Sequence, residues 1–393
     1  MESLFGFFIS LVSFLACLLC AALIGRTQYF SFLSERHSRF GCIDGIRGFL
    51  ALSVFFHHFI ISYYWKINGV WKRPPEDLFQ NLGKVGVVIF FMITGFLFFS
   101  RIVNRSKSID WIQLYKSRIF RIYPLYVFVL ILISLTVFIS SGFNLNVPPE
   151  RLVKEYVKWA LFLGRTINDF PETKQIIAGV DWTLKYEWLF YLSLPMIFLV
   201  QKFWGKLGLV ALALSTLYLF LYPIQFPYIS STFFIYFTIG ALISQLATRL
   251  EDLIKKQWLI VSILSFLLVL MTLSYPNTLD LFHILMISVL FLFVAAGNNL
   301  FTILSSRAAL VLGEISYSIY LTHGILLYWA FCDGSGITIN HLSIKEYALF
   351  MPIFSIVVIL FSTLTFFLIE KPGIEAGKKW NLFLKTKASK MAT

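Results

Sequence analysis

Long runs of apolar residues recur along nearly the whole chain, and polar residues gather in the short stretches between them. Each run is about 20 residues long, which is the length that a helix needs to cross about 30 Å of hydrocarbon. The pattern predicts eleven spans, at residues 3–24, 46–65, 83–100, 119–141, 183–200, 207–222, 228–247, 258–274, 279–296, 309–331 and 347–369. We therefore expect an all-α fold, a polytopic transmembrane helical bundle.

Composition excludes a soluble globular protein. The chain of 393 residues is 58% hydrophobic and only 13% charged, whereas soluble domains are about a quarter charged. Its net charge of +13 does not indicate nucleic acid, because Lys and Arg of membrane proteins gather in cytoplasmic loops. The four cysteines are isolated or lie within an apolar run, so we expect no metal site.

Charge in the loops predicts an orientation. Basic residues dominate the segment 101–121 and the tail after residue 370, so both should be cytoplasmic. The long segment 142–181 balances basic with acidic residues and is expected outside, with a short amphipathic helix in VKEYVKWALFLG. Counting eleven spans between these loops places the N-terminus outside and the C-terminus in the cytoplasm.

The stretch IDGIRGFLALSVFFHHF, residues 43–59, carries ionisable groups inside a predicted span. Arg47 and His58 are eleven residues apart, close to three helical turns, so both project from one face about 16 Å apart. His58 then lies near mid-membrane, where ionisable groups are costly and usually functional. A neutral histidine that forms a hydrogen bond between helices is the structural alternative.

Two further ionisable residues are expected at a similar depth. Glu187 lies just inside the outer end of its span, and His323 lies in the outer half of another. We expect them to converge with His58 in a cavity that opens outward. An imidazole beside a carboxylate can be held in one tautomer and act as a general base.

The cytoplasmic side offers a different set of residues. Arg118 and Arg121, in SRIFRIYPLY, are one turn apart at the start of a predicted helix. This spacing suits a bidentate grip on phosphates, although arginines at a cytoplasmic helix end are also ordinary topology signals. Gly86, Thr94 and Gly95 are small residues in a bulky span, which suits close helix packing or a narrow channel for an acyl chain.

Taken in order, these motifs resemble the bacterial membrane-bound acyltransferase 3 family, which O-acylates cell-surface glycans. The similar segments are IDGIRGFLALSVFFHH, KVGVVIFFMITGFLF, SRIFRIYPLY, DWTLKYEWLFY, ISYSIYLTH and IEKP. Thr94 and Thr183 stand where the family usually has serine. The resemblance covers about residues 41–372. It implies a ten-span acyltransferase domain there, an additional N-terminal helix and cytoplasmic linker at 1–40, and a basic cytoplasmic tail at 373–393.

The resemblance also implies a reaction. Acyl-CoA, usually acetyl-CoA, would be the donor and would bind from the cytoplasm, with no tightly bound cofactor. The acceptor would be a lipid-linked or surface glycan such as O-antigen, capsule or exopolysaccharide, outside a bacterial inner membrane. The residues expected to act are the catalytic set Arg47, His58, Glu187 and His323, the CoA-binding set Arg47, Arg118 and Arg121, and the channel residues Gly86, Thr94, Gly95, Trp182, Thr183 and Tyr320.

A transporter or flippase for a glycan, lipid or anionic solute is the alternative, because intramembrane His and Glu also suit proton relays. A catalytically silent acyl-CoA-binding protein is a third possibility. The mechanism assigned to these residues depends on one expectation, that Arg47 and His58 share a single cavity through the bundle, whereas the family resemblance does not depend on it. The sequence leaves open the acceptor sugar, the acyl group and the oligomeric state.

Overall fold

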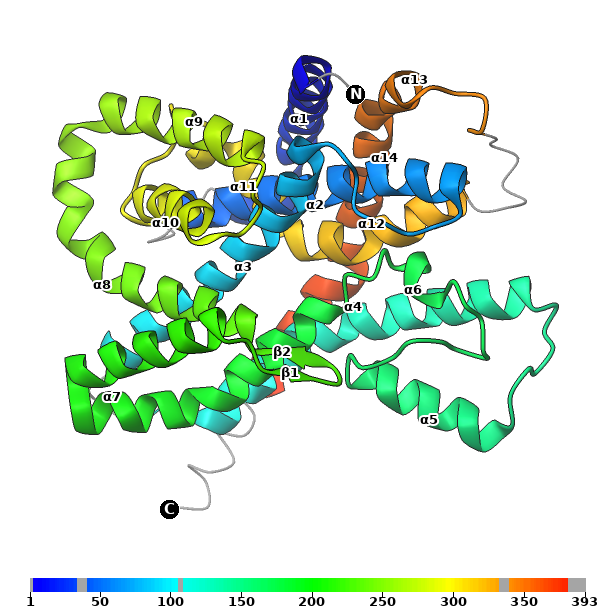
Figure 1. Ribbon diagram of the computed structural model, residues 1–393, viewed down its shortest axis with the longest axis horizontal. Helices are drawn as coiled ribbons and strands as arrows, with labels where there is room; N and C mark the ends of the chain where they lie inside the picture. The colour runs from blue at the N-terminus through cyan, green and yellow to red at the C-terminus, as the bar shows by residue number, and fades with distance from the viewer. Residues whose placement is uncertain (1–2, 34–40, 105–108, 332–338, 381–393) are drawn as a thin grey trace.

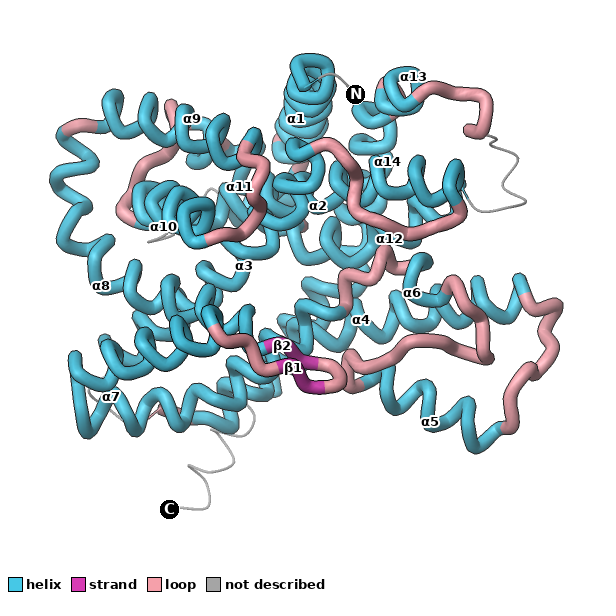
Figure 2. Tube along the Cα trace, in the orientation of Figure 1, coloured by secondary structure: helices cyan, strands magenta, loops and turns pink. Residues whose placement is uncertain are grey.

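The computed structural model describes residues 3–33, 41–104, 109–331 and 339–380, and helices make up most of that part of the chain (Figure 2). The long N-terminal helices are α1 (Ser3–Gly25), α2 (Gly41–Asn68), α3 (Asp77–Asn104) and α4 (Trp111–Ser140). The middle of the chain forms α5 (Pro149–Ala160), α6 (Thr173–Ile176), α7 (Trp182–Leu221), α8 (Phe234–Lys256), α9 (Trp258–Ser274) and α10 (Leu281–Ala295). The C-terminal helices are α11 (Arg307–Glu314), α12 (Ser316–Phe331), α13 (Ile344–Ala348) and α14 (Met351–Thr365).

Short elements join these helices. Three 3₁₀ turns lie at Gln28–Leu33, Ser231–Phe233 and Ile303–Ser305, and a π-helical turn at Phe366–Glu370 extends α14. Strands β1 (Gln225–Phe226) and β2 (Ile229–Ser230) form an antiparallel hairpin between α7 and α8. The amphipathic helix expected in the long loop is present as α5.

The helices confirm an all-α, polytopic membrane bundle. Among the described residues, seven helices are long and apolar enough to cross a membrane, and α11 with α12, bent by 65° at their junction, passes the same test as a pair. The shorter apolar helices α9 and α10 occupy two more of the predicted spans. Of the predicted domain boundaries, residues 34–40 of the linker and 381–393 of the basic tail lie outside the described residues.

The predicted spans at 183–200 and 207–222 are two arms of one element, α7. The chain turns back at Gly205, where φ is 53° and ψ is −127°. A glycine adopts this positive φ without the steric cost that a side chain would bring. The predicted span at 46–65 also begins earlier than expected, because α2 starts at Gly41 and so includes Asp44.

Helix α2 lies at the centre of the bundle and contacts α1, α3, α11, α12 and α14 (Figure 1). In the same view, α7 and α8 gather on one side and α4, α5 and α6 on the other. Glycines allow the closest helix contacts. A Cβ on Gly95 of α3 would lie 2.0 Å from the Phe237 carbonyl oxygen of α8, and one on Gly48 of α2 would lie 2.4 Å from Leu312 of α11. Small residues at such crossings are the usual solution in membranes.

Candidate active site

A polar cavity of about 320 Å³ lies among α2, α3, α4, α7 and α12. Its charged lining residues are Asp44, Arg47, Arg101, Arg118, Arg121 and Glu187. We call it the arginine cavity. Four cations against two carboxylates leave its walls positive, so it suits an anionic ligand.

Arg118 is placed for ligand binding by the rings beneath it. Its guanidinium lies 5.3 Å from the ring centre of Phe98 and 5.9 Å from that of Tyr191. The buried Nε makes no hydrogen bond within the described part of the chain. Because a guanidinium has five N–H donors, stacking fixes its plane while donors stay available to a ligand.

Arg121 is held by a carboxylate that sequence reasoning did not select. Its Nη2 lies 3.7 Å from Oε1 of Glu370, whose side chain is fully buried. Ser318 donates a hydrogen bond of 2.8 Å to the other carboxylate oxygen. Glu370 belongs to the IEKP motif, which lies at the end of the region that resembles the family and for which no role in the site was predicted. Its position directly after a long apolar run was the sequence feature that could have identified Glu370 as a site residue.

Glu187 lies with the arginines and not with the histidines, contrary to the expected grouping. It lines the arginine cavity, and Thr94 donates a hydrogen bond of 3.4 Å to its Oε1. Thr183, Glu187 and Tyr191 are four residues apart on α7 and all line this cavity, as one helical face requires. The neighbours of that face could not be predicted from the sequence.

His58 and His323 do come together, from α2 and α12. Nε2 of His323 lies 3.1 Å from Nδ1 of His58, and Nδ1 of His323 lies 2.9 Å from the carbonyl oxygen of Ile319. A carbonyl only accepts, so Nδ1 of a neutral His323 carries the proton and its Nε2 must accept from Nδ1 of His58. This chain of hydrogen bonds leaves the lone pair on Nε2 of His58 available as a base.

The environment of His58 differs from that of its neighbour His57. The His58 ring lies between the rings of His323, at a centroid distance of 5.1 Å, and Trp71, at 6.2 Å. His57 instead donates from Nδ1 to the carbonyl oxygen of Phe79, over 2.8 Å, and its ring packs on Gly83. Both histidines form their hydrogen bond through Nδ1, so they differ in their partners: His58 bonds to the imidazole of His323, whereas His57 anchors α2 to α3.

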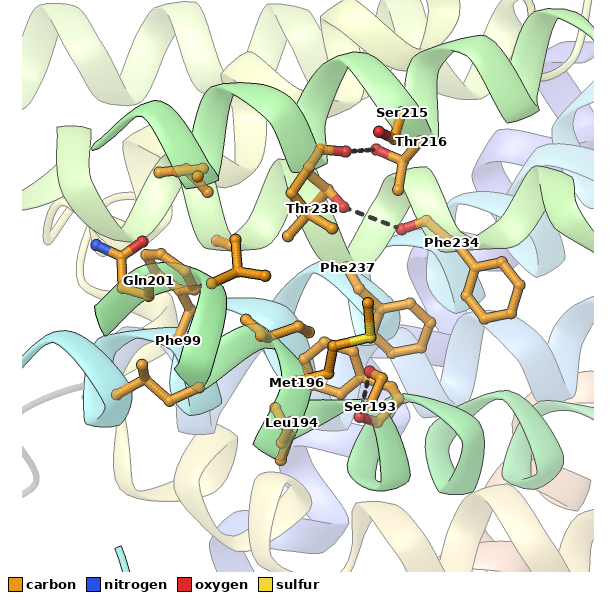
Figure 3. A pocket seen from close by; sticks show the side chains of 18 of the residues that line it. Phe99, Ser193, Leu194, Met196, Gln201, Ser215, Thr216, Phe234, Phe237 and Thr238 are labelled. Carbon is orange, nitrogen blue, oxygen red and sulfur yellow. Dashed lines mark hydrogen bonds between the residues drawn. The ribbon is translucent and has the colours of Figure 1, made fainter. Parts of the chain in front are cut away.

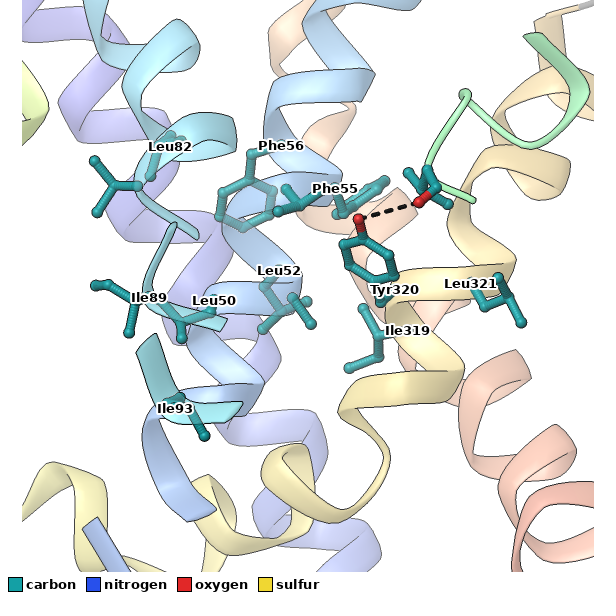
Figure 4. Close-up of a cluster of buried hydrophobic side chains, with 14 of the residues drawn as sticks. Leu50, Leu52, Phe55, Phe56, Leu82, Ile89, Ile93, Ile319, Tyr320 and Leu321 are labelled. Carbon is teal, nitrogen blue, oxygen red and sulfur yellow. Dashed lines mark hydrogen bonds between the residues drawn. The ribbon is translucent and has the colours of Figure 1, made fainter. Parts of the chain in front are cut away.

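Tyr320 separates the arginine cavity from the histidine pair. It lines that cavity, and its ring centre lies 6.3 Å from that of His323. Its hydroxyl lies 2.9 Å from that of Thr183 and donates to the carbonyl oxygen of Val180 over 3.3 Å, which holds the ring against the loop before α7 (Figure 4). Neither imidazole lines the arginine cavity, so the single shared cavity expected from the sequence is divided at Tyr320 in this structure.

The expected channel residues fall into two groups. Thr94, Thr183 and Tyr320 line the arginine cavity. Gly86 packs against α2, with its Cβ position 3.1 Å from a backbone oxygen, and Gly95 packs against α8. Their small size therefore serves helix contact. Trp182 lines a separate pocket beneath the β1–β2 hairpin.

Another cavity, of about 270 Å³, lies between the two arms of α7 and α8 (Figure 3). Its lining is apolar except for Ser, Thr and Gln side chains, and includes no charged residue. It therefore lacks the groups needed to bind a phosphate. Within the described residues, no group of three or more His, Cys, Asp or Glu side chains could hold a metal ion.

The chain is similar to several known proteins. The chain is 28% identical over 189 residues to Nodulation protein 10 of Rhizobium leguminosarum bv. viciae, covering 44% of this chain and 48% of that protein. It is 28% identical over 295 residues to the putative acetyltransferase ORF330 of Acidianus two-tailed virus, covering 72% and 81%. It is 26% identical over 175 residues to the O-acetyltransferase OatA of Staphylococcus aureus, covering 41% and 25%.

The matched region thus spans about half of Nodulation protein 10 and a quarter of OatA. No solved structure matches the chain. The family model described as an acyltransferase domain, that of the acyltransferase 3 family, matches residues 40–369. This match covers most of the chain and includes every residue that lines the arginine cavity and both histidines of the pair. The protein therefore belongs to the acyltransferase 3 family.

Proposed function

We propose that the protein is an integral membrane O-acyltransferase that moves an acyl group, acetyl above all, from acyl-CoA to a hydroxyl of a cell-surface or lipid-linked glycan. Family membership and the names of the relatives support acyl transfer over transport. One structural observation carries the proposal furthest. Two hydrogen-bonded histidines, His58 and His323, lie beside a cavity lined by four arginines, with the Tyr320 ring between His323 and that cavity.

In this proposal the arginine cavity receives the donor. Arg47, Arg118 and Arg121 grip the phosphates of CoA, because planar guanidiniums match phosphate oxygens in pairs. Glu187 and Glu370 lie beside these arginines and set their positions. Thr183 and Tyr320 also line this cavity, and the thioester lies beside them. Acyl transfer then requires the Tyr320 ring to move, because it separates this cavity from His323 in this structure.

His58 then acts as the general base. The acceptor hydroxyl gives its proton to Nε2 of His58 while its oxygen attacks the thioester carbonyl. The new carbon–oxygen bond forms, the carbon–sulfur bond breaks, and the CoA thiolate leaves and takes up the proton from His58. General base catalysis of this kind contributes about 10²–10⁴ to the rate. His323 holds the tautomer through its own hydrogen bond to Ile319.

The proposed sidedness follows from charge and from depth. The basic loops put the start of α2, with Arg47, at the cytoplasmic face of a bacterial inner membrane. His58 lies three turns further along the same helix. The donor would thus enter from the cytoplasm and the glycan from outside, with the N-terminus outside and the C-terminus in the cytoplasm.

Membranes that contain the protein, incubated with radiolabelled acetyl-CoA, test the proposal. Wild-type protein is expected to label glycan, and His58→Ala to lower the rate by about 10²–10⁴ with unchanged protein level and acetyl-CoA binding. His57→Asn is the matched control, because it alters the adjacent histidine and should retain most activity. Near-wild-type acetylation by His58→Ala would refute the base assignment. Wild-type membranes that never label glycan would refute the transfer reaction itself.

A further inference from the structure

A third cavity, of about 430 Å³, lies beneath the β1–β2 hairpin. Four segments form it, the loop at 162–165, α6 with the loop after it, the start of α7, and the hairpin with its turn at 225–230. We call it the hairpin pocket. The hairpin is far from the other segments in the sequence and meets them only in the folded chain.

The hairpin pocket is positively charged. Arg165, Lys174 and Lys185 line it, and no acidic residue does. Lys174 is neutralised by the fully buried Asp181, at 2.5 Å. Arg165 and Lys185 form no ion pair within the described residues, and each lies over an aromatic ring, at 5.5 and 5.4 Å. Two cations are thus available to an anion.

The remaining lining has the chemistry that recognises sugars. Trp182 and Tyr228 supply aromatic faces, against which the C–H faces of a pyranose pack, and Gln225 supplies an amide. The hairpin is held in place, since the backbone N–H of Ser230 donates to the Tyr186 hydroxyl over 2.8 Å and Gln225 donates to the Ser230 hydroxyl over 3.0 Å. The volume is in the range of small-ligand sites, about 300–1,000 Å³.

The pocket shares a short segment of backbone with α12, the helix that carries His323. Residues Gly179 and Trp182 line the pocket, while the neighbouring backbone packs on α12. A Cβ on Gly324, the residue after His323, would lie 2.3 Å from the carbonyl carbon of Ile177. The hairpin pocket and α12, the helix that carries His323, therefore both contact the short segment 177–182.

We infer that the hairpin pocket binds an anionic sugar of the acceptor, a pyranose that carries a phosphate or a carboxylate. This inference rests on the proposed function, because it gives the pocket the role of acceptor site. Charge-assisted hydrogen bonds from Arg165 and Lys185 hold the anion. Trp182 and Tyr228 hold the ring, and the next sugar extends toward His58.

Direct binding tests the pocket without any catalysis. Protein in phosphatidylcholine nanodiscs is titrated with glucose 1-phosphate, glucuronate and glucose. We expect at least one anionic sugar to bind more tightly than glucose, and the double variant Arg165→Gln/Lys185→Gln to weaken it by about tenfold or more. The matched control Lys154→Gln/Lys158→Gln removes two exposed cations of α5 and should bind as wild type does. The two anionic probes distinguish a phosphate from a carboxylate.

Three results would overturn the inference. They are wild-type affinity in the double variant, equal weakening in the control, and equal affinity for glucose and both anions. Nanodiscs with phosphatidylglycerol provide a fourth test, because loss of sugar binding there would show that lipid headgroups fill the pocket.

Kinetics separate this inference from the proposed function. In the acetyl-transfer assay, the double variant should raise KM for the acceptor by about tenfold or more, while kcat and acetyl-CoA binding stay unchanged. If wild-type protein transfers no acetyl group, the proposed function fails, and the nanodisc titration still decides whether the pocket binds anionic sugars. If transfer occurs with an unchanged KM in the double variant, only the acceptor-site inference fails.

Discussion

Replacing His323 by phenylalanine tests the hydrogen-bond chain that gives His58 its basic nitrogen. Phenylalanine keeps a ring in the buried site but removes the nitrogen that lies 3.1 Å from Nδ1 of His58. One neutral hydrogen bond is lost, worth about 0.5–1.5 kcal/mol, which corresponds to about 2- to 13-fold in rate. If the His58 ring turns over as well, the fall in rate approaches the factor of about 10²–10⁴ that is expected when the general base is missing. We therefore expect kcat to fall about tenfold or more.

The assay is the initial rate of acetyl transfer by purified protein in nanodiscs, with both substrates varied. KM for acetyl-CoA should not change, because His323 does not line the arginine cavity. His323→Gln should recover part of kcat, because its amide oxygen can accept from the same N–H of His58. Wild-type kcat in His323→Phe would refute the reasoning. A glutamine variant no better than phenylalanine would show that the site needs the imidazole for something other than accepting a hydrogen bond.

Three further predictions concern the donor site and the packing of the bundle. Glu370→Gln should raise KM for acetyl-CoA. It should also lower the free energy of unfolding, followed by thermal unfolding in detergent, by less than the loss of about 3–5 kcal/mol that follows when a fully buried pair is broken, because the Arg121 side chain is 28% exposed. An unchanged KM would contradict its role. Arg118→Lys should raise KM for acetyl-CoA with little change in kcat, because lysine keeps the charge but not the planar fork; a kcat defect alone would argue against donor binding. Gly95→Ala places a methyl group 2.0 Å from a backbone oxygen of α8 and should destabilise the protein by about 1–3 kcal/mol in thermal unfolding. Gly41→Ala is the control and should not destabilise it, because Gly41 has open space around it. Equal melting temperatures of the two variants would refute the packing argument.

Several features of the site were predictable from spacing along one helix. Arg47 and His58 were expected on one face of α2, and the structure places Arg47 at the arginine cavity and His58 beside His323. The rotation of about 100° per residue turns the adjacent His57 to another side of α2, where it bonds to Phe79 of α3. Such predictions can be made from the sequence because a helix has a fixed rise and rotation per residue.

Predictions of which residues pack against a given helix face were less successful. Glu187 was expected beside the histidines, but the turn at the start of α7 directs it into the arginine cavity. The ring of Tyr320, held by Thr183 and Val180, divides a cavity that was expected to be continuous. Glu370 received no role because Arg121, its partner, is 249 residues earlier in the chain.

By itself, the amino-acid sequence determined that this is a helical membrane protein and where most of its helices lie, because insertion depends on apolar content summed over about 20 consecutive residues. Only the tertiary structure decided which polar groups meet. His58 and His323 are 265 residues apart, and their contact depends on how α2 and α12 cross, which depends in turn on packing at many other positions. That packing is a property of the whole bundle, and no single stretch of sequence contains it.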